Sequence, residues 1–565
     1  MLLFCVKQQH MKKIIIGLIF LMTGSFLNAQ EKAFKAIDSA YYYYVKKDLK
    51  KAAYFYDLYY LVQKNTQSNY DTYRAAVASS YIGNMENAKY YIKRSGEIFY
   101  DYSGFYEFPS YDTFVNDTIH RYLRNLPEWK NFITVLKYKA DSAQISIDKI
   151  TMALKDTSNR ANQSVLSNTD YWNTVAKKES TASLIQKIKN FKAFKPVKKT
   201  DFWTMYYIKV NDTLTVPFLV YIPKNYQPVK KTPLYVYLHG AIVGRTNFSN
   251  PAWIEKGREV KIMDKAKSQN AFIIYPFGKK SFGWIYQQQA FETILREIEM
   301  IKSIYNIDDN KVYIGGHSNG GSGAFWYAVN KPTTFASFLG LNYLPKVYAS
   351  NTSLRNLKNS PTFYGISGSE DATFPLPVVD GIYKLGIENG ANWKNFVKQG
   401  GHGLPIDSKD SISFIFDTLI TKTRNPFPKN IQWETDNIRN GRNAWLEIIE
   451  LDTLAEKASW HTLLNPTVTQ NGKAGILDFS KNKSGAIIAS VQGNTIDIQT
   501  SRVKRIKIYI STDMFDLSHQ IKLIINGKDF INMKLDADKN VILEEFLKTK
   551  DRDFIVANKI ELAVK

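Results

Sequence analysis

Short apolar runs recur between about residues 203 and 398, and stretches with apolar residues at helical spacing separate most of the later ones. This alternation of strand-like and helix-like segments is typical of a sheet whose strands run mostly parallel. It predicts an α/β domain over residues 201–424. The eight expected strands lie at 203–211, 215–223, 233–239, 271–276, 311–316, 336–342, 361–367 and 393–398.

The patterns on either side of this stretch are different. Residues 31–150 have helical spacing, whereas beyond about residue 425 the apolar residues recur with a period of two, which indicates strands. We therefore expect a multidomain protein, with a helical domain at 30–150, a linker at 151–200 and a β-sandwich-like accessory domain at 425–565. The strands expected in the last domain lie at 444–449, 486–491, 495–499, 506–510 and 521–525.

The helical region contains a loose internal repeat. Small and aromatic residues at Ala40, Tyr43, Ala52 and Tyr56, and small residues one repeat later, resemble the spacing of tetratricopeptide repeats. Such repeats usually need three or more neighbours to bury their apolar faces. Because only two are indicated, we expect a small domain capped by the helix near Trp129. We expect its many tyrosines to pack between helices, and a groove that binds a peptide or protein partner is the functional alternative.

The first thirty residues have the layout of a secretory signal. Lys12 and Lys13 precede an apolar run from 14 to 27, which ends at Asn28-Ala29-Gln30. We expect residues 1–29 to be a signal peptide cleaved after Ala29, with Met11 as an alternative start. About fourteen apolar residues span only about 21 Å, short of the roughly 30 Å membrane core, so no permanent membrane span is expected. The mature protein would be periplasmic or extracellular.

Composition excludes several classes of chemistry. The only cysteine, Cys5, lies before the apolar run, so a mature exported chain would have no disulfide and no thiol nucleophile. No His, Asp and Glu residues fall at metal-ligand spacing, and no phosphate or dinucleotide motif is present, so no metal and no cofactor are expected. The net charge of +23 is scattered along the chain rather than gathered in one stripe, which argues against nucleic acid as a partner.

The pentapeptide Gly316-His317-Ser318-Asn319-Gly320 lies between an apolar strand and a helix-like run. In that context it predicts a nucleophile elbow, a sharp turn that requires small neighbours and exposes the serine hydroxyl at the end of a sheet. Ser318 is therefore the candidate nucleophile. The backbone N–H groups of Asn319 and of Ala241, which follows the third strand, are the candidates for an oxyanion hole.

A serine hydroxyl needs a base, and the base needs a carboxylate that orients it. Asp371 follows the seventh expected strand, and His402 follows the eighth within Gly400-Gly401-His402-Gly403. The order Ser, Asp, His is that of α/β-hydrolases. Glu370 and Asp380 are alternative acids close to Asp371. Among the other histidines, we expect His239 to brace the oxyanion loop.

The stretch from Tyr305 to Gly321 resembles the Y-x-I-D-x-x-R-V-Y-x-x-G-x-S-x-G-G segment of secreted esterases of the feruloyl esterase and polyhydroxybutyrate depolymerase-like group. Lys311 stands in place of the usual Arg. Val216–Pro223, Leu238-His239-Gly240 and Tyr275-Pro276 extend the resemblance over about residues 205–424. It implies an α/β-hydrolase fold and ester hydrolysis. Asn319 and the absence of cysteines depart from the group and leave the substrate open.

These observations predict an exported serine hydrolase that cleaves carboxylic esters, either of small molecules or linked to polysaccharides. Trp284, Tyr286 and Trp326 are candidates for an aromatic substrate pocket. Two alternatives stay open: a serine peptidase of the prolyl oligopeptidase type, because the same triad cleaves amides, and a binding scaffold without catalysis.

Overall fold

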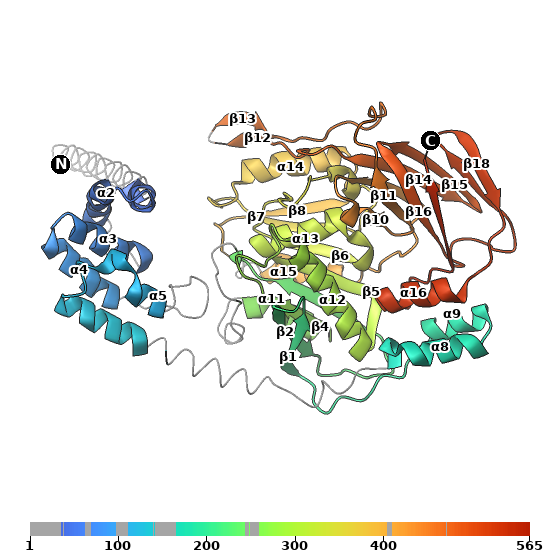
Figure 1. Ribbon diagram of the computed structural model, residues 1–565, viewed down its shortest axis with the longest axis horizontal. Coiled ribbons are helices and arrows are strands. Elements are labelled where there is room, and N and C mark those ends of the chain that lie inside the picture. Colours follow the sequence, from blue (N-terminus) through green and yellow to red (C-terminus); the bar gives the residue numbers. More distant parts are fainter. Residues whose placement is uncertain are drawn as a thin grey trace, which may run out of the picture. The chain divides into compact units, whose positions relative to one another are not determined.

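A computed structural model gives the fold of the chain (Figure 1). It describes residues 36–62, 69–97, 111–138, 165–242, 259–403 and 409–564, except 38 and 471, together with the single residues 141 and 248. The chain divides into two compact units, Met1–Asp148 and Lys149–Lys565, and each is described by itself. The predicted signal peptide lies outside the described residues. None of the helices in these ranges combines the length and the hydropathy that a membrane span requires.

The first unit is helical, as predicted. Ala52, Ala76 and Ala88 are fully buried between its helices, and Trp129 closes the same core. Small residues at these places let neighbouring helices approach closely, which explains their helical spacing. The assignment to tetratricopeptide repeats stays a prediction. The helices with defined bounds are α2 (Leu49–Val62), α3 (Asn69–Tyr81), α4 (Met85–Glu97), α5 (Tyr111–Asn116) and the 3₁₀ turn Thr118–His120.

An eight-stranded sheet forms the centre of the second unit, in the order β1-β2-β4-β3-β5-β6-β7-β8. β1 and β2 pair antiparallel, β2 and β4 pair antiparallel, and all other neighbours are parallel. Each strand falls on a predicted run. The bounds are β1 Phe202–Lys209, β2 Thr215–Ile222, β3 Thr232–Leu238, β4 Phe272–Pro276, β5 Ile307–His317, β6 Ser337–Leu341, β7 Phe363–Gly368 and β8 Trp393–Lys398.

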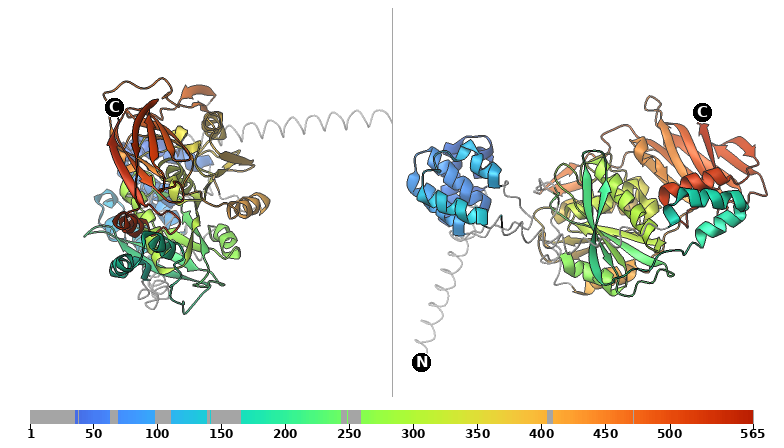
Figure 2. Two further views of the ribbon diagram at one scale, coloured as in Figure 1. Left: turned by 90° about the vertical axis from the view of Figure 1, so that its right-hand side faces the viewer. Right: turned by 60° about the horizontal axis from the view of Figure 1, so that its bottom comes forward.

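Helices cover both faces of this sheet (Figure 2). In β3, Val236 and Leu238 face one core together with α12, α13 and α14, whereas Tyr235 and Tyr237 face the other with α11 and α15. This alternation explains why the central strands read as continuous apolar runs. The helices are α11 Glu259–Ser268, α12 Gln288–Ile304, α13 Asn319–Asn330, α14 Leu376–Glu388 and α15 Lys409–Leu419.

The C-terminal region is rich in strands, as predicted. A five-stranded sheet (β18-β17-β15-β14-β9) and a four-stranded sheet (β10-β11-β16-β19) share one hydrophobic core. A separate hairpin, β12-β13, packs against α14. The bounds are β9 Asn430–Thr435, β10 Arg442–Asn443, β11 Leu446–Leu451, β12 Thr467–Gln470, β13 Lys473–Ile476, β14 Gly485–Gln492, β15 Thr495–Ser501, β16 Val503–Ile510, β17 Ile521–Ile525, β18 Lys528–Met533 and β19 Asn558–Ala563.

The predicted linker at 151–200 is wrong for much of its length, because residues 165–189 form a 3₁₀ turn (Val165–Ser167) and two helices, α8 (Thr169–Lys178) and α9 (Thr181–Lys189). Their apolar side chains pack against α16 (Lys539–Thr549), where the rings of Trp172 and Phe546 meet edge to face at 5.2 Å. The partner lies far along the chain, which local periodicity cannot reveal.

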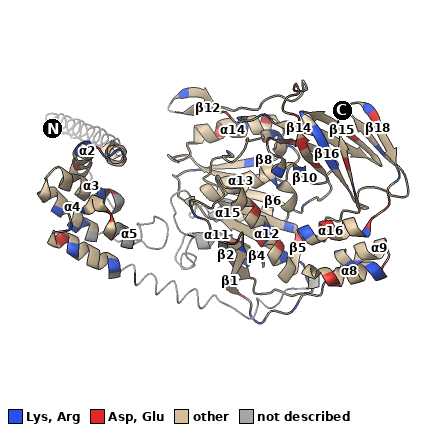
Figure 3. Cartoon of the chain, viewed as in Figure 1, with Lys and Arg blue, Asp and Glu red and all other residues tan. Residues whose placement is uncertain are grey.

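Charged residues also join the C-terminal region to the central sheet. Asp309 of β5 forms ion pairs with Lys302 at 3.0 Å and Arg552 at 2.9 Å, and Asp551 binds Arg424 through both carboxylate oxygens. All five side chains are buried. Elsewhere, Lys and Arg are spread over the helices and strands of both units (Figure 3).

Candidate active site

Ser318 lies between β5 and α13 in a backbone conformation that L-residues rarely adopt, with φ 55° and ψ −121°. The turn is tight enough that a Cβ at Gly316 would come within 2.2 Å of the Leu238 carbonyl oxygen, and one at Gly320 within 1.8 Å. Only glycine fits at either position. The backbone at Ser318 therefore makes a sharp turn of the kind expected for the pentapeptide, and the close approach of β3 explains its two glycines.

The three residues predicted to form a triad meet at the carboxyl end of the sheet. The hydroxyl of Ser318 donates to Nε2 of His402 at 2.9 Å, and Nδ1 of His402 donates to Asp371 Oδ2 at 2.8 Å. Because a carboxylate only accepts, His402 carries its proton on Nδ1, and Nε2 is free to accept the serine proton. Asp371 is buried, whereas the imidazole remains about one quarter exposed.

Asp371 is held in place from both sides. Its second carboxylate oxygen accepts hydrogen bonds from the backbone N–H groups of Thr373 at 2.8 Å and Phe374 at 2.9 Å. Burial alone would raise the pKa of Asp371, but the hydrogen bonds from His402 and Phe374 outweigh it and hold that pKa below its usual value. Asp371 therefore stays ionised at neutral pH, and it is this carboxylate, not Glu370 or Asp380, that contacts His402.

The loop expected to form an oxyanion hole lies directly against Ser318. A Cβ at Gly240 would stand 3.1 Å from Cβ of Ser318, and Ala241 has a positive φ of 54°. His239 braces this loop, because its Nε2 accepts from the backbone N–H of Gly278 at 3.1 Å and its Nδ1 donates to the Gly240 carbonyl at 2.8 Å. Asn319 is the first residue of α13, where backbone N–H groups have no partner within the helix.

The structure corrects two of the three predicted pocket residues. Trp326 is buried and stacks on Phe291 of α12 at 3.9 Å, because it lies on the face of α13 that packs against α12. Trp284 is also buried, and its Nε1 donates to the His239 carbonyl at 3.1 Å, so it braces the oxyanion loop instead of lining a pocket. Tyr286 is 53% exposed and is the one of the three open to a ligand.

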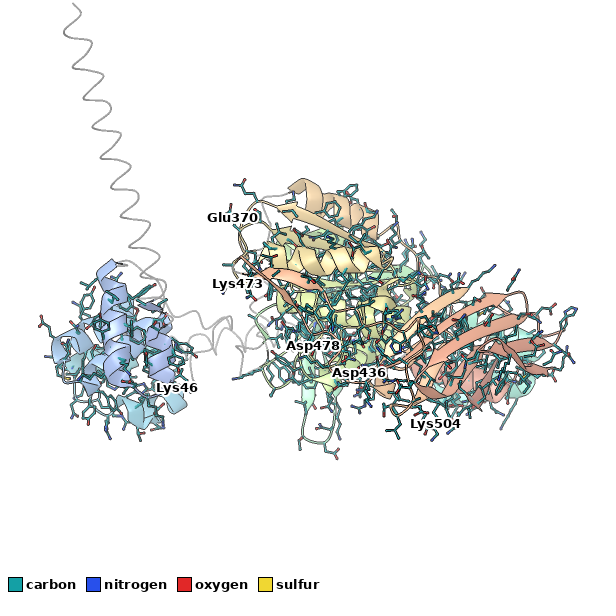
Figure 4. The ribbon with its side chains drawn as sticks, turned by 90° about the horizontal axis from the view of Figure 1, so that it is seen from above. Lys46, Glu370, Asp436, Lys473, Asp478 and Lys504 are labelled. Atoms are coloured by element: carbon teal, nitrogen blue, oxygen red, sulfur yellow. The ribbon has the colours of Figure 1, made fainter. Side chains whose placement is uncertain are left out.

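Two aromatic residues, one in contact with His402 and one in contact with Tyr286, carried no sequence signal of their own. Phe374 meets the His402 ring edge to face at 5.2 Å, and Tyr348 packs against Tyr286 at 5.4 Å. Phe374 could have been suspected from its closeness to Asp371, whereas Tyr348 lies in the segment after β6. Glu370, beside the acid, and Lys473 of the C-terminal hairpin lie on the same side of the second unit (Figure 4).

The arrangement brings together the kinds of group that acyl transfer requires. In the described part of the chain, no three His, Cys, Asp or Glu side chains are grouped so that they could hold a metal ion. A serine hydroxyl, an imidazole in the correct tautomer and an oriented carboxylate provide a nucleophile and a general acid and base. The N-terminus of α13 adds a positive end of a helix dipole next to Ser318.

Comparison with known proteins agrees with this chemistry. Residues 214–343 match the model of a family described as "Putative esterase". This confirms the prediction of a carboxylic ester hydrolase at the level of that family. The feruloyl esterase and depolymerase-like subgroup remains a prediction. No curated protein matches the chain.

Several solved structures align with about two fifths of the chain. A thermostable esterase is 18% identical over 39% of this chain and 63% of its own, with a TM-score of 0.33. A ferulic acid esterase is 18% identical over 40% of this chain and 99% of its own, with a TM-score of 0.33. The S-formylglutathione hydrolase of Agrobacterium tumefaciens is 16% identical over 39% of this chain and 93% of its own, with a TM-score of 0.30.

Proposed function

We propose that this protein is an exported serine hydrolase that cleaves carboxylic esters through Ser318, His402 and Asp371. The observation that carries the proposal is the unbroken chain of two hydrogen bonds from the serine hydroxyl through the imidazole to the carboxylate. The proposal of export rests on the signal-like pattern of residues 12–30.

The proposed reaction has two halves. In the first, Ser318 Oγ attacks the ester carbonyl carbon while His402 Nε2 takes its proton, and the tetrahedral intermediate then expels the alcohol, which receives that proton. An acyl group remains on the serine. In the second half, His402 activates a water molecule, which attacks the acyl carbon, releases the acid and restores the hydroxyl. Asp371 stabilises the imidazolium in both halves.

The developing negative charge needs hydrogen-bond donors. We propose the backbone N–H groups of Ala241 and Asn319 for this role, because Gly240 brings the first against the nucleophile and α13 begins at the second. Each such donor is worth about 3 kcal/mol of barrier. The substrate is proposed to be an ester of a small molecule or of a polysaccharide, with Tyr286 at the entrance.

Substitution of the serine tests the proposal. Ser318→Ala should reduce turnover of a short-chain nitrophenyl ester by about 10⁴-fold or more while the thermal midpoint changes little. Ser322→Ala is the matched control, because this serine lies one turn further along α13 and its hydroxyl donates to the Leu344 carbonyl at 2.8 Å. Wild-type rates in Ser318→Ala would refute the assignment.

The same experiment can distinguish ester from amide cleavage. A panel of acetylated sugars, hydroxycinnamoyl esters, aliphatic esters and short peptides should give turnover on esters and none on peptides. If the protein cleaved only peptides, and Ser318→Ala abolished this activity, the triad would be supported but the protein would be a peptidase and not an esterase.

A further inference from the structure

The base of the proposed triad stands on a loop with little stiffness of its own. His402 is flanked by Gly400, Gly401 and Gly403, and Gly400 has a φ of 128°, which only glycine adopts readily. A shift of about 1 Å in a catalytic group can cost on the order of 100-fold in rate. The surroundings of the loop must therefore fix the imidazole.

Four consecutive carbonyl groups of this loop each accept a hydrogen bond from the sheet. The Gly400 carbonyl accepts from the backbone N–H of Glu370 at 2.9 Å. Nδ2 of Asn342 donates to Gly401 at 3.2 Å and to Gly403 at 2.5 Å. Nε2 of His317 donates to the His402 carbonyl at 2.8 Å. We refer to these donors as the carbonyl cradle.

The donors of the cradle come from the ends of three adjacent strands. His317 is the last residue of β5, Asn342 directly follows β6, and Glu370 lies two residues beyond β7. These strands pair in parallel, so their carboxyl ends form one edge beneath the loop. The glycine-rich loop is thus hydrogen-bonded to residues at the ends of three paired strands, at the same edge that carries Ser318 and Asp371.

His317 acts here as a neutral donor. A carbonyl only accepts hydrogen bonds, so the proton of His317 resides on Nε2. Burial lowers the pKa of His317 to about 4, which keeps the ring uncharged at neutral pH. Its ring centre lies 5.2 Å from that of His402. A second charge beside the base would oppose formation of the imidazolium, and a neutral donor avoids this.

Asn342 is suited to its position by its backbone as well as its amide. Its φ is 43°, in the left-handed region that asparagine tolerates better than most residues, and its N–H donates to the Ile366 carbonyl at 2.8 Å. The side chain is almost fully buried. One amide group therefore holds the carbonyls on both sides of His402.

We propose that His317 and Asn342 are positioning residues that fix the imidazole of His402 through its backbone. The inference builds on the proposed function, because it assigns a role toward the proposed base. Neither side chain is needed to touch the substrate. Loss of either donor should release the loop, lengthen the two hydrogen bonds of His402 and slow proton transfer.

Kinetics of paired variants test the cradle. His317→Leu should lower kcat for a nitrophenyl ester by roughly 10- to 100-fold with KM nearly unchanged. His317→Gln, whose amide can donate from nearly the same place as Nε2, should recover most of that rate. Asn342→Gly allows the left-handed backbone conformation but removes the amide donor, so it should lower kcat to a similar extent. This second variant tests the cradle even if His317→Leu does not fold.

A second readout does not depend on turnover. In full-length protein labelled with ¹⁵N-histidine, the Nδ1 proton resonance of His402, identified by its loss in His402→Gln, reports the bond to Asp371. It should broaden in His317→Leu and Asn342→Gly and stay sharp in His317→Gln. Unchanged kcat and an unchanged resonance in both donor-less variants would overturn the cradle. Activity that survives Ser318→Ala would overturn the proposed function instead.

Discussion

At the scale of single residues, the site depends on conformations that the chain adopts at a cost. Ser318 holds a positive φ that is strained for a residue with a side chain, and the contacts of β3 and α13 leave it no alternative. Asp371 is buried yet ionised, because it accepts three hydrogen bonds from His402, Thr373 and Phe374. Strain and burial are both tolerated where they orient reacting atoms.

Asp371→Asn should reduce kcat by about 10³- to 10⁴-fold. The amide would present an N–H group to His402 Nδ1 and favour the tautomer with the proton on Nε2, which cannot accept the serine proton. Steady-state hydrolysis of a nitrophenyl ester measures the effect. Glu370→Gln is the control, because this exposed neighbour does not contact the imidazole. Equal losses in the two variants would contradict the assignment of the acid.

The three side chains of the proposed triad, which the structure brings within hydrogen-bond distance, could be selected from sequence because the chemistry restricts residue type, chain order and position after a strand. His317 and Asn342 could not be assigned a role in this way, since their importance depends on where the His402 loop passes over the sheet. Trp326 was mispredicted for a related reason. Nearness to Ser318 along the chain does not say which face of α13 a side chain occupies.

At the scale of elements, the end of β7 packs so closely against the His402 loop that a side chain there would clash with it. Gly368 ends β7, and a Cβ there would stand 2.5 Å from the Gly400 carbonyl oxygen and 2.7 Å from that of Gly401. Both contacts are with backbone, which cannot rotate away as a side chain would. The position of His402 is therefore coupled to the size of the residue at 368.

Gly368→Ala should displace the His402 loop, lower ester turnover roughly 10- to 100-fold and cost about 1–3 kcal/mol of stability. Gly475→Ala provides a matched substitution in a strand, because a Cβ at that exposed position of β13 meets no atom within 4 Å. Turnover and thermal unfolding of both variants check the prediction. A fully active Gly368→Ala would show that the loop is adaptable.

The strands of the central sheet were predictable because strands buried on both faces read as uninterrupted apolar runs. The partners of α8 and α9 were not. Their buried residues, such as Trp172 and Ile185, contact Phe546 and its neighbours more than 350 positions later. Six strands of the C-terminal region were also not predicted. β10, β12 and β13 have only two to four residues, which carry too little periodicity, whereas β9, β18 and β19 have six residues each and still fall on none of the expected runs.

At the scale of the whole second unit, buried charges join the strand-rich region to the central sheet. Arg552 is 2% exposed and reaches Asp309, while also donating to Asn306 Oδ1 at 2.8 Å and to the Phe191 carbonyl at 3.1 Å. Removing one member of such a cluster leaves its partners buried without compensation. The C-terminal region thus contributes to the stability of the central domain.

Arg552→Met should destabilise the protein by about 3–5 kcal/mol, because Asp309 remains fully buried with one cation fewer. Arg505→Met is the comparison, since its ion pair with Glu561 is exposed and worth about 1 kcal/mol or less. Urea unfolding followed by tryptophan fluorescence measures both. Similar small losses in the two variants would mean that the buried cluster adds no stability.

A cavity of about 210 Å³ lies between α12 and the C-terminal region, and a carboxyl group in its lining makes the stability of the protein depend on pH. Burial raises the pKa of Glu299, which lines it, from 4.5 to about 7. The folded protein therefore keeps a proton that the unfolded chain loses, and stability falls as pH rises from about 4.5 to 7. Glu299→Gln should be stabilised relative to wild type by on the order of 1–3 kcal/mol at pH 8 and by little at pH 4.5.

Denaturation of wild type, Glu299→Gln and the exposed-site control Glu388→Gln at both pH values checks this sign. An advantage of Glu299→Gln that grew toward acid pH would contradict it.

The most direct test of the central claim is to locate a covalent adduct. Treatment of the folded full-length protein with a fluorophosphonate, followed by digestion and peptide mass spectrometry, should place one phosphonyl group per chain on Ser318. The adduct should be absent in Ser318→Ala and retained in Ser322→Ala. No adduct on folded wild-type protein, or an adduct on another residue that persists in Ser318→Ala, would contradict the account.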